Sequence, residues 1–251
     1  MAPIKSSLAR SASKLFGVFR DRDLSLRGAT SSIKNTISFQ ATGGTKITSG
    51  SYDYHVFTSS STLVVDGSGP ATILVIAAGG SGGAGFSGNG EYGGGGGGAG
   101  GIAYAANVTV TGGTHTVTVG SPAPNVAGGA QNVGGPAPQA AGGSSAFGHN
   151  GSSAEFPYGV LVGGGTPGGT SGNNPPADPF GGSAASTTGG STGGSGARNN
   201  PGRSAGNSTE SFPGDWTPYG NKGGDGGFPQ SNGAGGGGAG GAGSLSGASS
   251  Q

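Results

Sequence analysis

The stretch "GEYGGGGGGAGG", residues 90–101, places six consecutive glycines where a globular protein carries side chains. The chain has 251 residues and 64 glycines, of which only seven precede residue 79. An apolar share of 30% is too small for an ordinary hydrophobic core along the whole length. The glycines lack the G-X-Y period of collagen. A flexible linker and an ordered glycine-rich structure remain as interpretations.

An ordered structure requires glycine backbones that pack directly against one another. An extended helix of the polyproline-II type has three residues per turn and directs its N–H and C=O groups outward. Because glycine has no Cβ, such helices can approach closely enough to bond to each other. Every third residue from Gly79 to Gly100 is glycine except Glu91, but glycine is so frequent there that this phase is weak support. We expect residues 121–251 to form long glycine-rich loops of polyproline-II or polyglycine-II character.

Such loops are costly to order. Glycine loses more conformational freedom on folding than any other residue, and large apolar side chains are sparse after residue 120. We therefore expect neighbouring chains to contribute, as a homo-oligomer with a trimer preferred.

Residues 36–120 instead predict an antiparallel, sandwich-like β scaffold. "SYDYHVFTSSSTLVV" (51–65) alternates Tyr52, Tyr54 and Val56 on one face, and "ATILVIAA" (71–78) is a continuous apolar run, typical of a strand buried on both sides. The expected fold class is thus mainly β.

A hairpin is the clearest local prediction in this region. "NVTVTGGTHTVTV" (107–119) has two alternating runs joined by Gly112-Gly113, and glycine supplies the positive φ that a primed two-residue turn needs. Pairing across this turn sets Val110 opposite His115, and Val108 opposite Val117.

The segment 1–34 is a basic head. It carries seven Lys or Arg and two Asp, so its net charge is +5, and −4 remains for the rest of a chain whose total is +1. Apolar residues at helical spacing predict a short amphipathic helix. Its apolar stripe needs a surface, which is either the rest of this chain or a larger assembly. A frayed terminus and an organelle transit peptide are alternatives.

The head also carries a family resemblance. "MAPIKSSLAR", followed by "DLSLRG" at 23–28, resembles the opening shared by structural proteins of marine cyanophages and related marine phages. In that family the opening precedes unrelated bodies, which implies a common attachment tag that docks to other virion proteins. The candidate docking residues are Leu8, Arg10, Lys14, Leu15, Phe16, Phe19, Arg20 and Arg27.

A second resemblance covers residues 52 to about 165. The segments "VFTSSSTLVV", "ATILVIAAGGSGG", "GGGGGGAGG" and "VTVTGGTHTVTVG" occur in the order found in the glycine-rich domain of phage tail fibres. The resemblance implies a β-rich scaffold with projecting glycine-rich loops, in a tail fibre or surface appendage that attaches to a host. A capsid or tail decoration without receptor binding and a eukaryotic glycine-rich cell-wall protein are the alternatives.

Aromatic residues interrupt the glycine-rich region, most densely in "SFPGDWTPYG" (211–220). Phe212, Trp216 and Tyr219 either fill gaps between glycine layers or contact a receptor at a loop tip, where aromatic rings stack on sugars.

Catalytic chemistry is not predicted. The chain has no cysteine, its three histidines lack metal-ligand spacing, and its ten acidic residues form no convincing acid and base pair. No apolar run is long enough for a membrane-spanning helix, and the body lacks a basic stripe for nucleic acid. We expect no enzyme activity, cofactor, metal or membrane span.

Overall fold

The computed structural model describes residues 39–88, 90–124, 140–169, 190–194, 196, 212, 216–225 and 232–244, with the side chains of 86–92 left out. The chain divides into two units, Met1–Ser38 and Phe39–Gln251, and every described residue belongs to the second. The predicted N-terminal helix and its docking residues lie outside the described residues.

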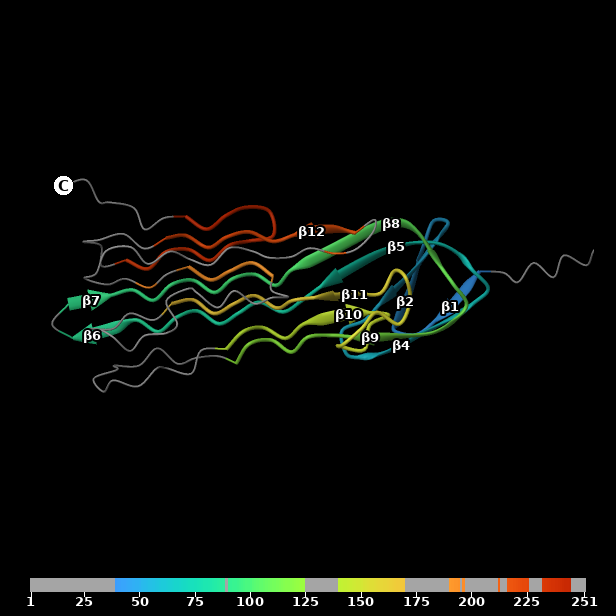
Figure 1. Cartoon of the computed structure of the whole chain (residues 1–251), viewed down its shortest axis with the longest axis horizontal. Coiled ribbons are helices and arrows are strands. Elements are labelled where there is room, and N and C mark those ends of the chain that lie inside the picture. The colour runs from blue at the N-terminus through green and yellow to red at the C-terminus, as the bar shows by residue number, and fades with distance from the viewer. Residues whose placement is uncertain are drawn as a thin grey trace, which may run out of the picture. The chain divides into compact units, whose positions relative to one another are not determined.

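The described part is mainly β, as expected, and its strands pair in antiparallel fashion (Figure 1). A five-stranded sheet has the order β1 (Gln40–Thr42), β4 (Ser61–Asp66), β9 (Gly113–Thr118), β10 (Ser145–Phe147), β11 (Val160–Val162). A three-stranded sheet has the order β12 (Thr217–Tyr219), β8 (Ile102–Val110), β5 (Gly69–Ile76). Two pairs complete the set: β2 (Thr45–Ser49) with β3 (Tyr52–Val56), and β6 (Phe86–Gly88) with β7 (Gly90–Tyr92).

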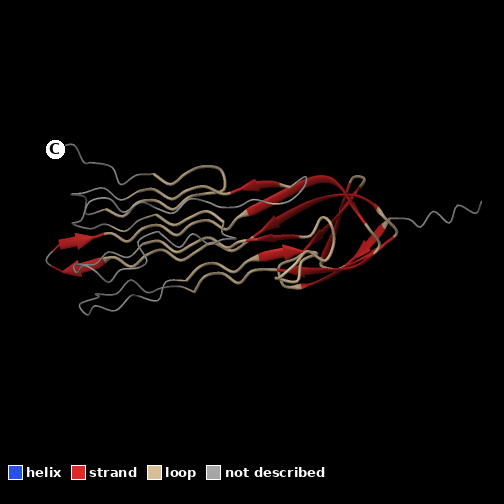
Figure 2. Cartoon of the chain, in the orientation of Figure 1, coloured by secondary structure: helices blue, strands red, loops and turns tan. Residues whose placement is uncertain are grey.

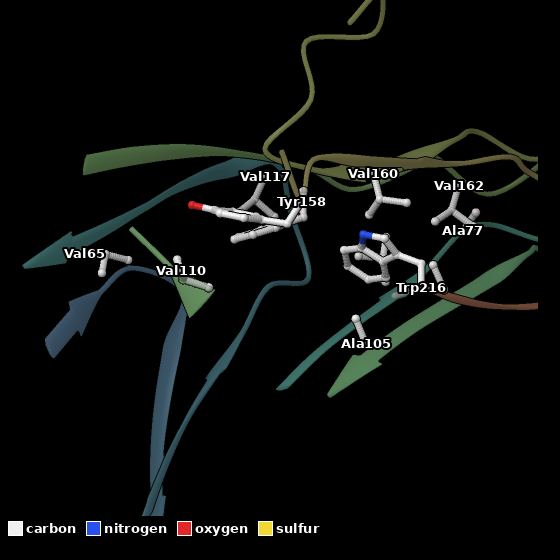
Figure 3. Close-up of a cluster of buried hydrophobic side chains, with 12 residues drawn as sticks. Val65, Ala77, Ala105, Val110, Val117, Tyr158, Val160, Val162 and Trp216 are labelled. Atoms are coloured by element: carbon white, nitrogen blue, oxygen red, sulfur yellow. The ribbon is translucent and has the colours of Figure 1, made fainter. Parts of the chain in front are cut away.

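The two larger sheets share one apolar cluster (Figure 3). Val65 and Val117 come from the five-stranded sheet, and Ala105 comes from the three-stranded one. Tyr158 and Trp216 enter from outside the strands and fill the remaining space with the largest rings. Alternating side chains of β5, β8, β9 and β11 supply much of this core, since successive residues of a strand point to opposite faces.

Strand β5 corrects one prediction. The apolar run at 71–78 does form a strand, but it is not buried on both sides: Val75 is buried, whereas Leu74 and Ile76 are 57% and 55% exposed. The continuous apolar run of β5 therefore does not indicate a strand that is buried on both faces.

The hairpin predicted at residues 107–119 is wrong. Strand β8 pairs with β5 and β12, whereas β9 pairs with β4 and β10 in the other sheet. His115 faces Leu63 instead of Val110, and Val108 faces Ala71. Of the two linking glycines only Gly113 has a positive φ (+140°), so the turn is not the primed type.

The chain crosses between the sheets at this point. The link from β4 to β5 lies alongside, because the amide of Gly112 donates to Ser68 Oγ at 3.3 Å. Two strands thus bend together from one sheet into the other, which places alternating side chains of both halves around one core. The shared core is formed by residues far apart in the chain, and burial in it outweighs the local preference of Gly112-Gly113 for a hairpin turn.

A single antiparallel ribbon runs from residue 61 to residue 117. Ser61 faces Val117 in the first sheet, and Ile76 faces Ile102 in the second. The same register continues beyond the strands, where the amide of Gly80 donates to the carbonyl of Gly98. The register shifts by one residue between the pairs Val65–Gly113 and Gly69–Val110, and it shifts back between Ala71 and Ile73, opposite the part of β8 where Asn107 has a φ of +56°.

The expected boundary at residue 120 does not separate the strands from the glycine-rich chain. β10, β11 and β12 lie beyond it, and glycine-rich segments at 77–85 and 93–101 lie before it. Many of the glycine-rich segments continue directly from a strand or lead into one, as 77–85 follows β5 and 93–101 leads into β8 (Figure 2). The two kinds of structure therefore alternate along the chain.

Candidate functional site

The glycine-rich segments are joined to one another by backbone hydrogen bonds. We call this set the glycine lattice; its described segments are 77–85, 93–101, 119–124, 140–144, 163–169, 190–194, 220–225, 232–238 and 241–244. Between the first two segments the amides of Ala77, Gly80 and Gly83 donate to Gly101, Gly98 and Gly95 at 3.0, 2.9 and 2.8 Å. The donors recur at every third residue, unlike the period of two in a β-ladder.

Segment 93–101 lies at the centre of the lattice. The amides of Gly95, Gly98 and Gly101 donate to segment 163–169, and those of Gly96 and Ala99 donate to segment 232–238. Segment 190–194 bonds back, because Gly194 donates to Gly96. One polypeptide segment thus holds four neighbours through its backbone.

Side chains are excluded from most of these contacts. A Cβ built on Gly97 would overlap the carbonyl oxygen of Gly80 and lie 2.7 Å from that of Ser81. On Gly96 it would lie 2.8 Å from the amide nitrogen of Gly236. Real Cβ atoms essentially never approach backbone so closely. Glycine is required at these positions for close approach, not for an unusual backbone angle.

The glycines at every third position from Gly79 do not all lie on one packed face of the lattice. In segment 77–85, Gly79 and Gly82 are exposed, and a Cβ there would meet its nearest atom at 3.5 and 3.9 Å. In segment 93–101 the same series of positions includes Gly97, which packs directly against the backbone of Gly80. The lattice therefore has room for a side chain on its outer side at Gly79 and Gly82, and it also encloses a few small polar side chains, such as those of Ser191 and Thr192.

Several chain segments lie side by side at the end of the lattice that leads to β6 and β7. Gly95 donates to Gly169, which itself donates to Gly194. Gly233 lies against Gly94, since a Cβ on Gly233 would overlap the carbonyl oxygen of Gly94. Figure 1 shows these segments running in parallel rows towards that end. The chain thus reaches the same end repeatedly.

The three aromatic candidates for receptor contact do not form one exposed group. Trp216 is only 7% exposed and belongs to the apolar cluster (Figure 3). Phe212 packs against this cluster. Tyr219 is 43% exposed and lies in β12, paired with Ile102 of β8. The prediction of a shared loop tip is wrong for Trp216, because its ring fills the core.

The pair β2–β3 presents two different faces. Facing residues of an antiparallel pair lie on the same side, and Ile47 faces Tyr54 while Thr45 faces Val56. Tyr52 lies two residues before Tyr54, with ring centroids 6.4 Å apart. These apolar side chains are exposed by 44 to 68% of their surface: Ile47, Tyr52, Tyr54 and Val56.

The opposite face of this pair is polar. Asp53 accepts a hydrogen bond from Thr48 Oγ1 at 2.6 Å and pairs with Lys46 Nζ at 2.9 Å. The hydrogen bond from Thr48, followed by the bond from Lys46, lowers the pKa of Asp53 below its ordinary value of 3.8. Next to them, His55 Nδ1 lies 2.8 Å from the carbonyl oxygen of Gly43.

The other two histidines have structural surroundings. His115 is fully buried, with Nε2 2.9 Å from the carbonyl oxygen of Thr111. It lies among the rings of Phe147, Phe156 and Tyr158, and its Nδ1 has no partner. His149 Nδ1 accepts from the amide of Gly151. In the described ranges no three His, Asp or Glu side chains gather as metal ligands.

The same part of the chain contains no helix with the length and apolar character needed to cross a bilayer.

Exposed side chains on β5 and β8 were missed by the sequence analysis. Leu74 and Ile76 were expected inside, and Tyr104 was not singled out. In "IAYAANVTV" (102–110), Tyr104 lies between the buried Ala103 and Ala105, and it is this burial, not the sequence pattern, that shows the tyrosine to face outward. An outward tyrosine between two inward alanines indicates an apolar outer surface.

No protein-family model, curated protein or solved structure matches this chain.

Proposed function

We propose that this chain is a non-enzymatic structural protein of a bacteriophage virion, in a tail fibre or surface appendage. The N-terminal segment docks to other virion proteins, and the glycine-rich body displays loops for attachment to a host. The resemblance of "MAPIKSSLAR" and "DLSLRG" to the marine phage opening supports the docking role. Three copies of the chain form the appendage.

The observation that carries the display role is the return of the chain to one end of the lattice. Gly94, Gly169, Gly194 and Gly233 gather there. Binding residues are concentrated on loops that a rigid scaffold positions. A lattice held by backbone bonds at every third residue supplies such a scaffold without a large apolar core.

The three-residue period supports polyglycine-II character for the lattice. A helix of this type has three residues per turn and no internal hydrogen bonds, so each N–H is available to a neighbour. Hydrogen exchange tests this assignment. We expect slow exchange at Gly80, Gly83 and Gly98, because each amide is bonded within the lattice. Exchange as fast as in a free peptide would contradict it.

Adsorption to host cells tests the display role. Purified residues 36–251 should bind to host cells and compete with phage adsorption. Binding without competition, or no binding, would instead favour an architectural decoration. The eukaryotic cell-wall alternative predicts cleavage of the first segment, so an intact start at Met1 or Ala2 of the mature chain contradicts it.

Deletion of residues 2–33 tests the docking role. We expect the truncated chain to fold, because the described strands begin at Gln40, and to be absent from particles. Normal incorporation of the truncated chain would refute docking through this segment.

A further inference from the structure

The outer face of the three-stranded sheet is apolar and exposed. Leu74 faces Tyr104, which faces Thr217 on its other side. One row further, Ile76 faces Ile102, which faces Tyr219. Leu74, Ile76, Tyr104 and Tyr219 are exposed by 38 to 57% of their surface. We call these four residues the sheet face.

The unit therefore has a second exposed apolar surface besides that of β2–β3. We call Ile47, Tyr52, Tyr54 and Val56 the hairpin face. Within the strands that carry them, the described side chains on the same side as either face include none with a charge; Lys46 and Asp53 lie on the opposite side of the hairpin. Exposed apolar patches of this kind mark interaction sites.

We propose that the hairpin face of one copy binds the sheet face of a neighbouring copy. A face that bound itself would pair two copies about a two-fold axis, whereas each interface of a cyclic trimer joins two different surfaces. Contact between the two different faces instead covers both surfaces with one kind of interface, which can close into a ring. Neither face carries a charged side chain, so contact between them leaves no charge without a partner.

The available area fits such an interface. With about half of each side chain exposed, and roughly 200 Å² for a large side chain, each face offers about 400 Å². Their contact would bury about 800 Å² of apolar side chain. Since roughly three fifths of an interface is apolar, the total is about 1,300 Å², within the range of specific interfaces, ~1,200–2,000 Å².

The hairpin itself has a reason to need a partner. A two-stranded hairpin is at best marginally stable in water, and among the described strands β2 and β3 pair only with each other. Covering Tyr52 and Tyr54 against a second copy would hold this pair in place. The inference rests on the self-association in the proposed function and not on the virion role.

Cross-linking tests the contact directly, because the chain contains no cysteine. Tyr54→Cys and Leu74→Cys are made in separate full-length chains, one with a longer affinity tag, and the two are co-expressed. After a short bis-maleimide is added to the purified protein, we expect a cross-linked product containing both chains. Either variant expressed alone should give none.

A matched control uses the polar side of the hairpin. Thr48 is exposed and lies opposite the hairpin face, so Thr48→Cys co-expressed with Leu74→Cys should give no product. Cross-linking of Leu74→Cys with itself, or absence of the mixed product, would overturn the proposal. A monomeric mass of the unmodified protein at micromolar concentration in light scattering would also overturn it.

The double variant Tyr54→Cys/Leu74→Cys tests whether the oligomer is a closed ring. We expect its largest covalent species to equal the oligomer mass in solution, with three copies. A ladder that extends without limit would show an open chain and overturn the closed ring. Because all these measurements use purified protein, their failure would leave the virion role standing, and a failure of adsorption would leave this contact standing.

Discussion

Alanine substitution at Gly97 provides a sensitive test of the glycine lattice. The new Cβ would overlap the carbonyl oxygen of Gly80 and lie 2.7 Å from that of Ser81, both in the facing backbone. Contacts under 3.0 Å are essentially absent for real Cβ atoms, so segment 77–85 must move away from Gly97. Backbone cannot rotate away as a flexible side chain can.

This movement weakens neighbouring hydrogen bonds. The bonds from Gly80 to Gly98 and from Gly83 to Gly95 are now 2.9 and 2.8 Å long. A separation larger by about 0.5 Å takes both beyond the usual range for N–H···O bonds. Each lost bond costs about 1 kcal/mol, and more where the groups stay buried. We therefore expect Gly97→Ala to lower the free energy of unfolding by about 2–4 kcal/mol.

Gly82→Ala is the matched control, and its effect should have the opposite sign. Gly82 is exposed, its φ is not positive, and the nearest atom to a new Cβ is 3.9 Å away. Replacing such a glycine reduces the entropy of the unfolded chain and stabilises by about 0.4–1 kcal/mol. Urea unfolding followed by circular dichroism measures both variants. Equal effects of the two substitutions would refute close backbone packing in the lattice.

Three further predictions concern single side chains. Trp216→Ala should lower the free energy of unfolding by about 3–5 kcal/mol, because it removes the largest side chain of the cluster. The control Thr217→Ala, at an exposed position in the adjoining strand, should change the free energy of unfolding in urea by less than about 0.5 kcal/mol. Tyr158→Phe should cost about 1 kcal/mol, since its hydroxyl accepts from the amide of Thr111 at 3.1 Å; an unchanged unfolding midpoint would contradict this. Because the pKa of Asp53 is lowered, its stabilisation of β2–β3 is present above about pH 4 and is lost as the pH falls through the folded-state pKa. NMR titration of the Asp53 carboxyl should therefore show a midpoint below 3.8. A midpoint above 3.8 would exclude the bonds to Thr48 and Lys46.

Local patterns predicted strands better than they predicted partners. The alternation in residues 107–119 correctly indicated two strands, but Val108 and Val117 lie in different sheets. Likewise, the apolar run of β5 indicated a strand, but not that Leu74 and Ile76 face outward. Pairing and facing depend on which distant segment lies alongside, and short local sequence patterns carry no information about that.

The candidate site shows the same division. The aromatic density at 211–220 drew attention to Trp216, which the tertiary structure uses in the core. The exposed surfaces of β2–β3 and of the three-stranded sheet emerged only from burial and register. An exposed tyrosine and a buried one are identical in sequence, so this distinction requires the fold.

Composition by itself determined that the body is not built around an ordinary core, because 64 glycines and few large apolar residues leave the backbone as the main packing material. Sequence also indicated strands between residues 51 and 119 through alternation and β-branched residues, but it did not indicate β10, β11 and β12. Only the tertiary structure decided which glycines must be glycine: Gly97 lies against a backbone carbonyl, whereas Gly82 faces open space. The physical reason is that Cβ exclusion depends on the distance to a neighbouring segment, and that distance is fixed by hydrogen bonds between segments far apart in the chain.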